Sequence, residues 1–154
     1  MLNTTYSANT DIDPDDIIKF IEDYVELPLG YLVHPSVIRD NTITGKVKFN
    51  PLEFSVIIDN ILLNSQKFNA SNLFITFTKS DDYLTINFSD DGAGVNNQIV
   101  DCQKLFDAGY SSSGGTGNGL YTVKKYIDRI GGTVSFNDTY TKGFELNVRL
   151  KLWI

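Results

Sequence analysis

Two alternating apolar runs, separated by only three residues, restrict the possible folds more than any other feature of this 154-residue chain. The runs are NLFITFTK at 72–79 and YLTINFS at 83–89, with SDD between them. Every second residue in each run is apolar, which is the period of a strand with one buried face. Because so short a linker joins neighbouring antiparallel strands, we expect a hairpin. A doubly wound parallel sheet, which needs a helix in each crossover, is excluded.

Helical signals precede this hairpin in two places. Asn50 and Pro51 are a good N-cap and first helical residue, and an apolar stripe follows them at helical spacing. The stripe comprises Phe54, Ile57, Ile58, Ile61 and Leu62. Asp13 and Pro14 give the same signals for a helix over about 14–26.

The remaining pattern completes the expected fold. Residues 96–106 and 120–130 have helical character, and 131–138 and 143–154 contain two closing strands. Short strand-like pieces end at Phe49. The order predicts an α/β (α+β) fold. It is a two-layer sandwich, in which a mixed, mostly antiparallel sheet is covered on one face by about three helices.

Charge and composition exclude several classes of protein. The formal net charge is −6 and the pI is about 4.6, which disfavours nucleic acid and anionic membrane surfaces as partners. No apolar run approaches the roughly 20 residues of a membrane span. A single cysteine permits no disulfide within the chain, so we expect a reducing, cytoplasmic setting.

The first candidate site segment lies on the helix that begins after Asn50. Asn60, Asn64 and Lys67 have the spacing i, i+4 and i+7, so they share one face of that helix. Amide oxygens could hold a hard cation such as Mg²⁺, while the lysine could meet a phosphate. A solvated helix face is the structural alternative.

The second segment is DDGAGV at 90–95, where a strand ends. A carboxylate at Asp90 can accept a hydrogen bond from the exocyclic amine of adenine, and it would repel the keto oxygen of guanine. Gly92 and Gly94 allow the backbone to approach a flat base closely. An ordinary Asp-Gly turn is the alternative.

The third segment is GGTGNGL at 114–120, which leads into a helix. Bare amides at a helix N-terminus form an anion site. No Lys-Ser/Thr pair follows the last glycine, and the spacing G-x-G-x-G of Gly115, Gly117 and Gly119 differs from that of a dinucleotide fingerprint. A flexible linker is the alternative.

Together, in this order, the segments resemble the Bergerat ATP-binding fold. This fold is shared by gyrase-type topoisomerases, heat-shock chaperones, mismatch-repair ATPases and sensor histidine kinases. DNILLNSQKF resembles the N box of the family and DDGAGV its first glycine box. Leu105 and Phe106 resemble the hydrophobic box, and GTGNGL the second glycine box. The resemblance covers about residues 46–151.

The resemblance implies ATP and Mg²⁺ as ligands, with a role for each matching residue. Asp90 would bind the adenine amine, Asn64 the Mg²⁺, and Lys67 a phosphate. Asn60 occupies the position of a general base or its polar substitute. The nucleotide site would comprise Asn64, Lys67, Phe68, Asp90, Gly92, Gly94, Val95, Leu105, Phe106, Gly115, Thr116, Gly117, Asn118, Gly119 and Leu120.

The amide at Asn60 separates the branches of this family. Hydrolytic branches usually have a glutamate there to activate water, and an amide cannot accept a proton at neutral pH. Asp59 lies about 100° around the helix and is expected to point elsewhere. The pattern Asn-x-x-x-Asn-x-x-Lys, with a short lid over 107–118, therefore resembles the sensor histidine kinase branch most. The resemblance implies transfer of the γ-phosphate to a histidine on another domain or partner protein.

Other interpretations remain open. A chaperone-like or mismatch-repair-like ATPase, whose nucleotide state drives a lid or dimer switch, is one alternative. A non-catalytic ATP-binding sensor is another. The only histidine, His34, precedes a proline in a strand-like context and is expected to be a structural or surface residue.

Departures from the family pattern, and the expected domain limits, complete the prediction. Ser65 replaces the usual alanine, Asn118 the usual leucine, and Phe144 the usual threonine after Gly143. We expect a flexible N-terminus over 1–12, a helix and connecting segment over 13–45, and the ATP-binding domain over 46–154. The whole is expected to be one domain of a longer protein.

Overall fold

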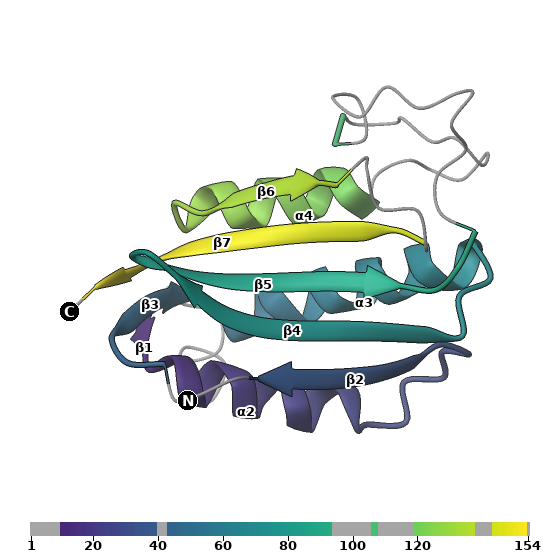
Figure 1. The fold of residues 1–154 in the computed structure, drawn as a ribbon, viewed down its shortest axis with the longest axis horizontal. Coiled ribbons are helices and arrows are strands. Elements are labelled where there is room, and N and C mark those ends of the chain that lie inside the picture. The colour runs from purple at the N-terminus through teal and green to yellow at the C-terminus, as the bar shows by residue number, and fades with distance from the viewer. Residues whose placement is uncertain (1–9, 40–42, 94–105, 108–118, 138–142, 154) are drawn as a thin grey trace.

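A computed structural model describes residues 10–39, 43–93, 106–107, 119–137 and 143–153. The described residues form seven strands and three helices (Figure 1). In chain order they are β1 (Thr10–Ile12), α2 (Pro14–Val25), β2 (His34–Arg39), β3 (Lys46–Phe49), α3 (Pro51–Lys67), β4 (Asn72–Ser80), β5 (Tyr83–Asp90), α4 (Gly119–Arg129), β6 (Thr133–Phe136) and β7 (Glu145–Trp153).

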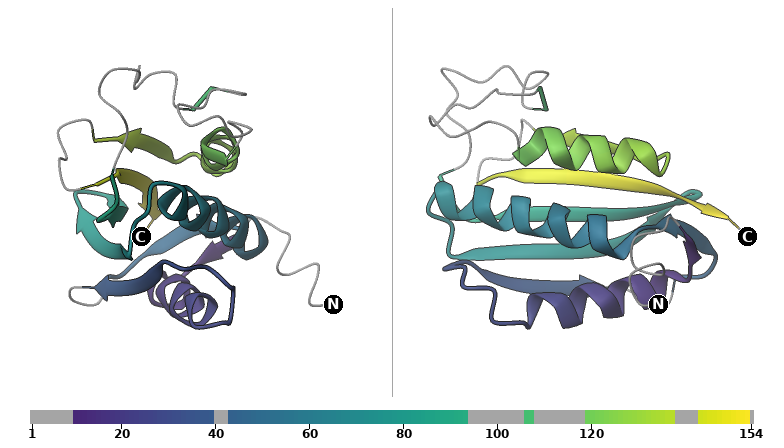
Figure 2. Two further views of the ribbon diagram at one scale, coloured as in Figure 1. Left: turned by 90° about the vertical axis from the view of Figure 1, so that its right-hand side faces the viewer. Right: turned by 180° about the vertical axis from the view of Figure 1, so that it is seen from behind.

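The strands form one sheet in the order β1-β3-β7-β5-β4-β2, and β6 also pairs with β7. The β2–β4 pair is parallel, and the other pairs are antiparallel. In the end-on view of Figure 2, α2, α3 and α4 all lie on the same side of the sheet. The predicted two-layer sandwich with a mixed, mostly antiparallel sheet is confirmed.

The strand hairpin and the central helix form as the sequence predicts. β4 and β5 pair from Leu73 with Asp90 to Ser80 with Tyr83. Asn50 caps α3 by accepting a hydrogen bond from the backbone N–H of Glu53 at 3.1 Å. The predicted apolar stripe of α3 is fully buried against the inward face of the sheet, with Ile58, Ile61 and Leu62 each 0% exposed.

The N-terminal segment differs from the expectation in two respects. Residues 10–12, expected to be flexible, form β1, because β3 offers them an antiparallel partner from Phe49 to Val47. Asp13 is the N-cap of α2, but its side chain makes no capping bond. Its carboxylate instead pairs with the ammonium of Lys46 at 2.7 Å, which ties the start of α2 to β3.

Several predictions lie outside the described residues. These are the short helix over 96–106, apart from Phe106, and the lid over 107–118, apart from Asp107. Within the described ranges, no helix is long and apolar enough to cross a membrane.

Candidate functional site

Asp90, the last residue of β5, has a fully buried carboxylate, which accepts hydrogen bonds from at least three donors among the described residues. The hydroxyl of Ser65 donates to Oδ2 at 2.7 Å. The backbone N–H groups of Phe144 and Gly92 donate to Oδ1 at 2.9 and 3.1 Å. The carboxylate is therefore fixed in position by α3, by the turn after β5 and by the residue that precedes β7.

Two glycines allow this close packing. A Cβ atom on Gly143 would overlap the backbone oxygen of Asp90 and lie 2.6 Å from its Oδ1. A Cβ atom on Gly92 would lie 2.7 Å from the backbone oxygen of Phe68. Because real Cβ atoms do not approach backbone oxygens so closely, both positions require glycine for steric reasons.

The second carboxylate of the DDG sequence has a different task. Asp91 Oδ1 accepts hydrogen bonds from the backbone N–H groups of Ser71 and Asn72 at 2.7 and 2.9 Å. Its Oδ2 accepts from the Asn72 amide at 2.9 Å. The Asn72 side-chain bond, followed by the backbone bonds, holds the pKa of the Asp91 carboxyl below its ordinary value. Asp91 therefore braces the start of β4, whereas the carboxylate of Asp90 is held by α3 and by the residue before β7.

The polar residues of α3 lie at different depths along one face. Lys67 is exposed, and Asn60 and Asn64 are half-buried. The Asn64 Nδ2 atom is buried without a hydrogen-bond partner among the described residues. An amide end that is buried and unsatisfied is costly in a folded protein unless a ligand supplies the missing partner.

The start of α4 adjoins Asn60. The helix begins at Gly119, and a Cβ atom there would lie 3.5 Å from Oδ1 of Asn60. The N-terminus of α4, which is the positive end of its helix dipole, therefore lies beside this amide of α3. Leu120 follows as a half-buried residue that packs against the core.

Asp59 points away from this face, as expected. Its Oδ1 accepts a hydrogen bond from the hydroxyl of Tyr24 on α2 at 2.9 Å. Burial, together with this bond, raises the pKa of Tyr24 to about 12. The Asp59 carboxylate is engaged in the contact between α2 and α3. It therefore does not substitute for the glutamate that hydrolytic branches have at the position of Asn60.

The described residues fit a Mg²⁺ ion held with a polyphosphate. Asn60 and Asn64 supply amide groups, and the Asn64 amide has an end that no described residue satisfies. A half-turn about its Cβ–Cγ bond exchanges the amide nitrogen and oxygen, so this side chain can meet either a phosphate or a cation. Mg²⁺ is commonly held by one or two protein oxygens, with phosphate oxygens and water completing its shell.

Some predicted site residues are described and others are not. Phe68 caps the C-terminus of α3, its carbonyl accepts from the N–H of Ala93 at 2.9 Å, and Phe106 is half-buried against the core. The predicted residues that lie outside the described ranges are Gly94, Val95, Leu105, Gly115, Thr116, Gly117 and Asn118.

Sequence reasoning missed two donors to Asp90, Ser65 and Phe144, and the steric role of Gly143 beside it. From the sequence, Ser65 and Phe144 were noted only as departures from the family pattern, and Gly143 only as a match to it. A signal was present for Ser65, because a polar residue at 65 follows the apolar positions 58, 61 and 62 of the buried stripe. No local signal pairs position 144 with position 90, because that contact depends on the register of β7 beside β5.

His34 is the first residue of β2 and is exposed. It lies in a strand, as expected.

Comparisons with known proteins place this geometry in a family. The sequence profile of the histidine kinase-, DNA gyrase B- and HSP90-like ATPases matches residues 50–154, which include α3, Asp90 and Gly119. The chain belongs to this family. The match thus supports an ATP-binding domain of the histidine-kinase-like ATPase type.

Curated relatives are sensor kinases. The chain is 30% identical to the sensor histidine kinase CpxA of Escherichia coli over 111 residues, which cover 68% of this chain and 24% of CpxA. It is 33% identical to a probable C4-dicarboxylate sensor kinase of Bacillus subtilis over 76 residues, covering 48% of this chain and 14% of that protein. The chain thus spans a quarter or less of the length of these relatives.

Solved structures share the fold. The mycobacterial sensor histidine kinase MprB matches with a TM-score of 0.71 at 17% identity, covering 95% of this chain and 99% of that one. Full-length ShkA, solved in complex with AMPPNP, matches with a TM-score of 0.75 at 18% identity, covering 95% of this chain and 32% of ShkA. At these identities the likeness concerns the fold. The resemblance to the sensor histidine kinase branch is confirmed by the relatives and these neighbours together.

Proposed function

We propose that this chain is the Mg-ATP-binding catalytic domain of a histidine-kinase-type protein, and that it transfers the ATP γ-phosphate to a histidine on another domain or partner. One observation supports the proposal: two segments distant in sequence reach α3. The carboxylate of Asp90 accepts a hydrogen bond from Ser65, and Gly119 lies near Asn60, where an added Cβ would be 3.5 Å from the amide oxygen. An adenine site and a phosphate site would then lie along a single helix.

Asp90 is proposed to select adenine. A carboxylate oxygen can accept more than one hydrogen bond, so Oδ2 can serve Ser65 and the exocyclic amine of the base together. The backbone at Gly92 would approach the flat base. Phe68, at the end of α3, would flank the nucleotide.

The face of α3 that carries Asn60, Asn64 and Lys67 is proposed to bind the phosphates. Asn64 would hold Mg²⁺, which when bound neutralises charge on the phosphates. Lys67 would contact a phosphate as a point charge, and the N-terminal amides of α4 would donate to phosphate oxygens. The undescribed site residues, Gly94, Val95, Leu105, Gly115, Thr116, Gly117 and Asn118, are proposed to complete this enclosure.

Asn60 is proposed to position groups rather than to remove a proton. A neutral amide cannot act as a general base at pH 7, and Asp59 is engaged with Tyr24. Catalysis would therefore consist of holding the γ-phosphate in line with an incoming imidazole, which supplies its own nucleophilic nitrogen.

The isolated chain tests this proposal without knowledge of the acceptor. Calorimetry should detect Mg²⁺-dependent ATP and ADP binding. Release of phosphate from ATP should be far slower than the roughly 10 s⁻¹ typical of enzymes. Replacing Asn60 with glutamate should raise hydrolysis if a base is the missing element. The absence of nucleotide binding would overturn the proposal, and rapid hydrolysis by the parent chain would favour the chaperone-like or mismatch-repair-like ATPase.

A further inference from the structure

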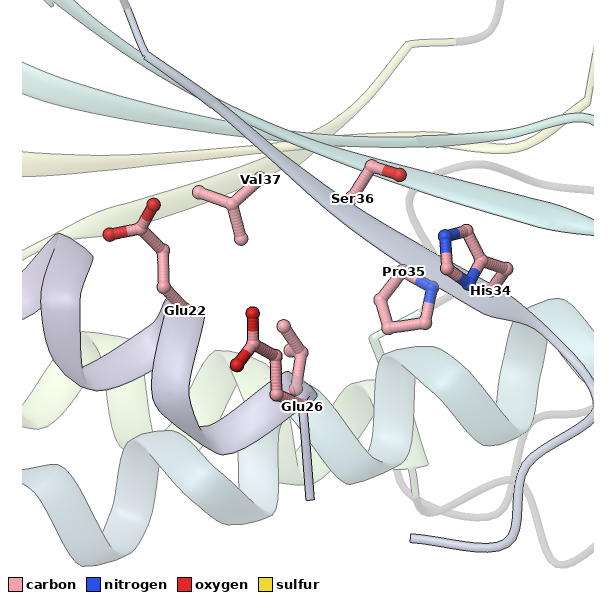
Figure 3. A pocket seen from close by; sticks show the side chains of 7 residues that line it. Glu22, Glu26, His34, Pro35, Ser36 and Val37 are labelled. Carbon is pink, nitrogen blue, oxygen red and sulfur yellow. The ribbon is translucent and has the colours of Figure 1, made fainter. Parts of the chain in front are cut away.

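A hollow outside the nucleotide site lies between α2 and the edge strand β2. It has a volume of about 650 Å³ and is lined by Glu22 and Val25 of α2, by its C-cap Glu26, and by His34, Pro35, Ser36 and Val37 of β2. In Figure 3, the two glutamates rise from α2 toward the underside of β2. We refer to these seven residues as the β2 groove.

β2 is the last strand of the sheet and pairs on one side with β4. Among the described residues, no strand pairs with its other side. The N–H of His34 donates to the carbonyl of Ser71, beside β4, at 2.9 Å. Because peptide groups alternate in direction along a strand, those of Val37 and Arg39 are directed to the open edge.

Pro35 falls on the same alternation as Val37 and Arg39. Its missing N–H is therefore on the open side, where a proline costs the sheet no hydrogen bond. The open edge retains the carbonyls of Pro35 and Val37 and the N–H of Val37. An exposed edge of this kind is a template for another extended segment.

Two carboxylates beside the open edge of β2 make this part of the surface acidic. Glu22 and Glu26 are exposed and stand one helical turn apart, so they face the groove together. Among the described residues neither pairs with a cation. By contrast, the neighbouring acids Asp15 and Asp23 are paired with Arg39 and Lys19.

From the open edge and its unpaired carboxylates, we infer that the β2 groove docks an extended, basic segment of a partner protein. The segment adds as a strand beside β2, with main-chain hydrogen bonds at Val37. Every second side chain of the segment lies over α2. These side chains are lysines or arginines, which pair with Glu22 and Glu26. Val25 and the Pro35 ring supply the apolar floor of the groove.

The test uses a blocked peptide in which lysine alternates with valine, titrated into the isotope-labelled chain and followed by NMR. Shifts should concentrate at residues 34–39 and 22–26. Replacing Glu22 and Glu26 with glutamine should weaken binding about two- to tenfold, because exposed ion pairs each contribute little. A matched double variant, Asp81→Asn with Asp82→Asn, removes the same charge at the β4–β5 turn and should leave binding unchanged.

The main-chain part of the inference has its own controls. Val37→Pro removes the outward N–H and should abolish the shifts, while Val37→Thr keeps the N–H and nearly the same shape and should preserve them. A peptide with every backbone amide methylated should not bind. The inference is overturned if that peptide or a glutamate-valine peptide binds equally well. It is also overturned if both charge variants behave alike, or if β2 of the free chain already pairs with a second copy.

Discussion

Replacing Asp90 with asparagine removes the proposed adenine acceptor while preserving the shape of the site. The introduced side chain can keep its Oδ1 where the Gly92 and Phe144 amides donate, at 3.1 and 2.9 Å in the parent. Its Nδ2 then replaces the Oδ2 atom that accepts from Ser65. The serine hydroxyl can rotate and become the acceptor, so the substitution costs the fold little.

The cost falls on nucleotide binding. The new N–H group would face the N–H of the adenine amine, so a charge-assisted hydrogen bond is replaced by two opposed donors. The loss of such a bond is about 1.5–3 kcal/mol, which corresponds to a loss of affinity of about ten- to 150-fold.

Calorimetry with Mg-ADP measures this loss, and urea unfolding verifies that the variant is folded. Asp91→Asn is the matched control, because it makes the same chemical change in the adjacent carboxylate, which braces β4. GTP should bind the parent far more weakly than ATP. Equal ADP affinity of the parent and Asp90→Asn would refute the assignment of Asp90 as the base-reading residue.

Four further substitutions separate binding from stability. Asn64→Ala should reduce Mg²⁺-dependent ATP affinity in calorimetry and leave the melting temperature nearly unchanged, since the Nδ2 atom has no partner to lose among the described residues. If the variant unfolds instead, the role of Asn64 is structural. Leu62→Ala should lower the free energy of unfolding by about 2–5 kcal/mol through a core cavity, as measured in urea, and a loss below about 1 kcal/mol would contradict its burial. Gly143→Ala should cost about 1–3 kcal/mol or more, because the added Cβ meets the backbone of Asp90; a wild-type melting temperature would disprove that contact. The loss of unfolding free energy in Asp91→Asn should be greatest above the ordinary carboxyl pKa of 3.8 and should shrink as the pH falls below it, because the pKa in the folded state is depressed. A loss that does not change with pH would show that the charge of Asp91 contributes nothing to stability.

The fold was largely predictable because its signals are local. Asn50, Pro51 and the apolar stripe of α3 are close in sequence, and the hairpin of β4 and β5 is set by strand period and a short turn. β1 was not predictable in this way. Two of its three residues, Thr10 and Ile12, favour strands, but so short a run gives no periodic signal, and it forms a strand because β3 is available to pair with it.

The same division applies to the site. Asp90 and the α3 amides stood out from their spacing and their place at element ends. Two of the donors to Asp90 come from residues 25 positions before it and 54 after it, so only the folded register brings Ser65 and Phe144 to the carboxylate. Asp13 shows the limit of cap signals, since a nearby Lys46 competes for its side chain.

ATP is proposed to lie along α3, between Asp90 and the start of α4. An NMR titration of the labelled chain with Mg²⁺ and a non-hydrolysable ATP analogue tests this placement most directly. We predict that the largest shifts occur at Asn60, Asn64, Gly92 and Gly119, and that the amide of Asp90 shifts with ADP as well. Saturable binding that leaves these resonances unmoved and shifts another surface would contradict the proposed placement.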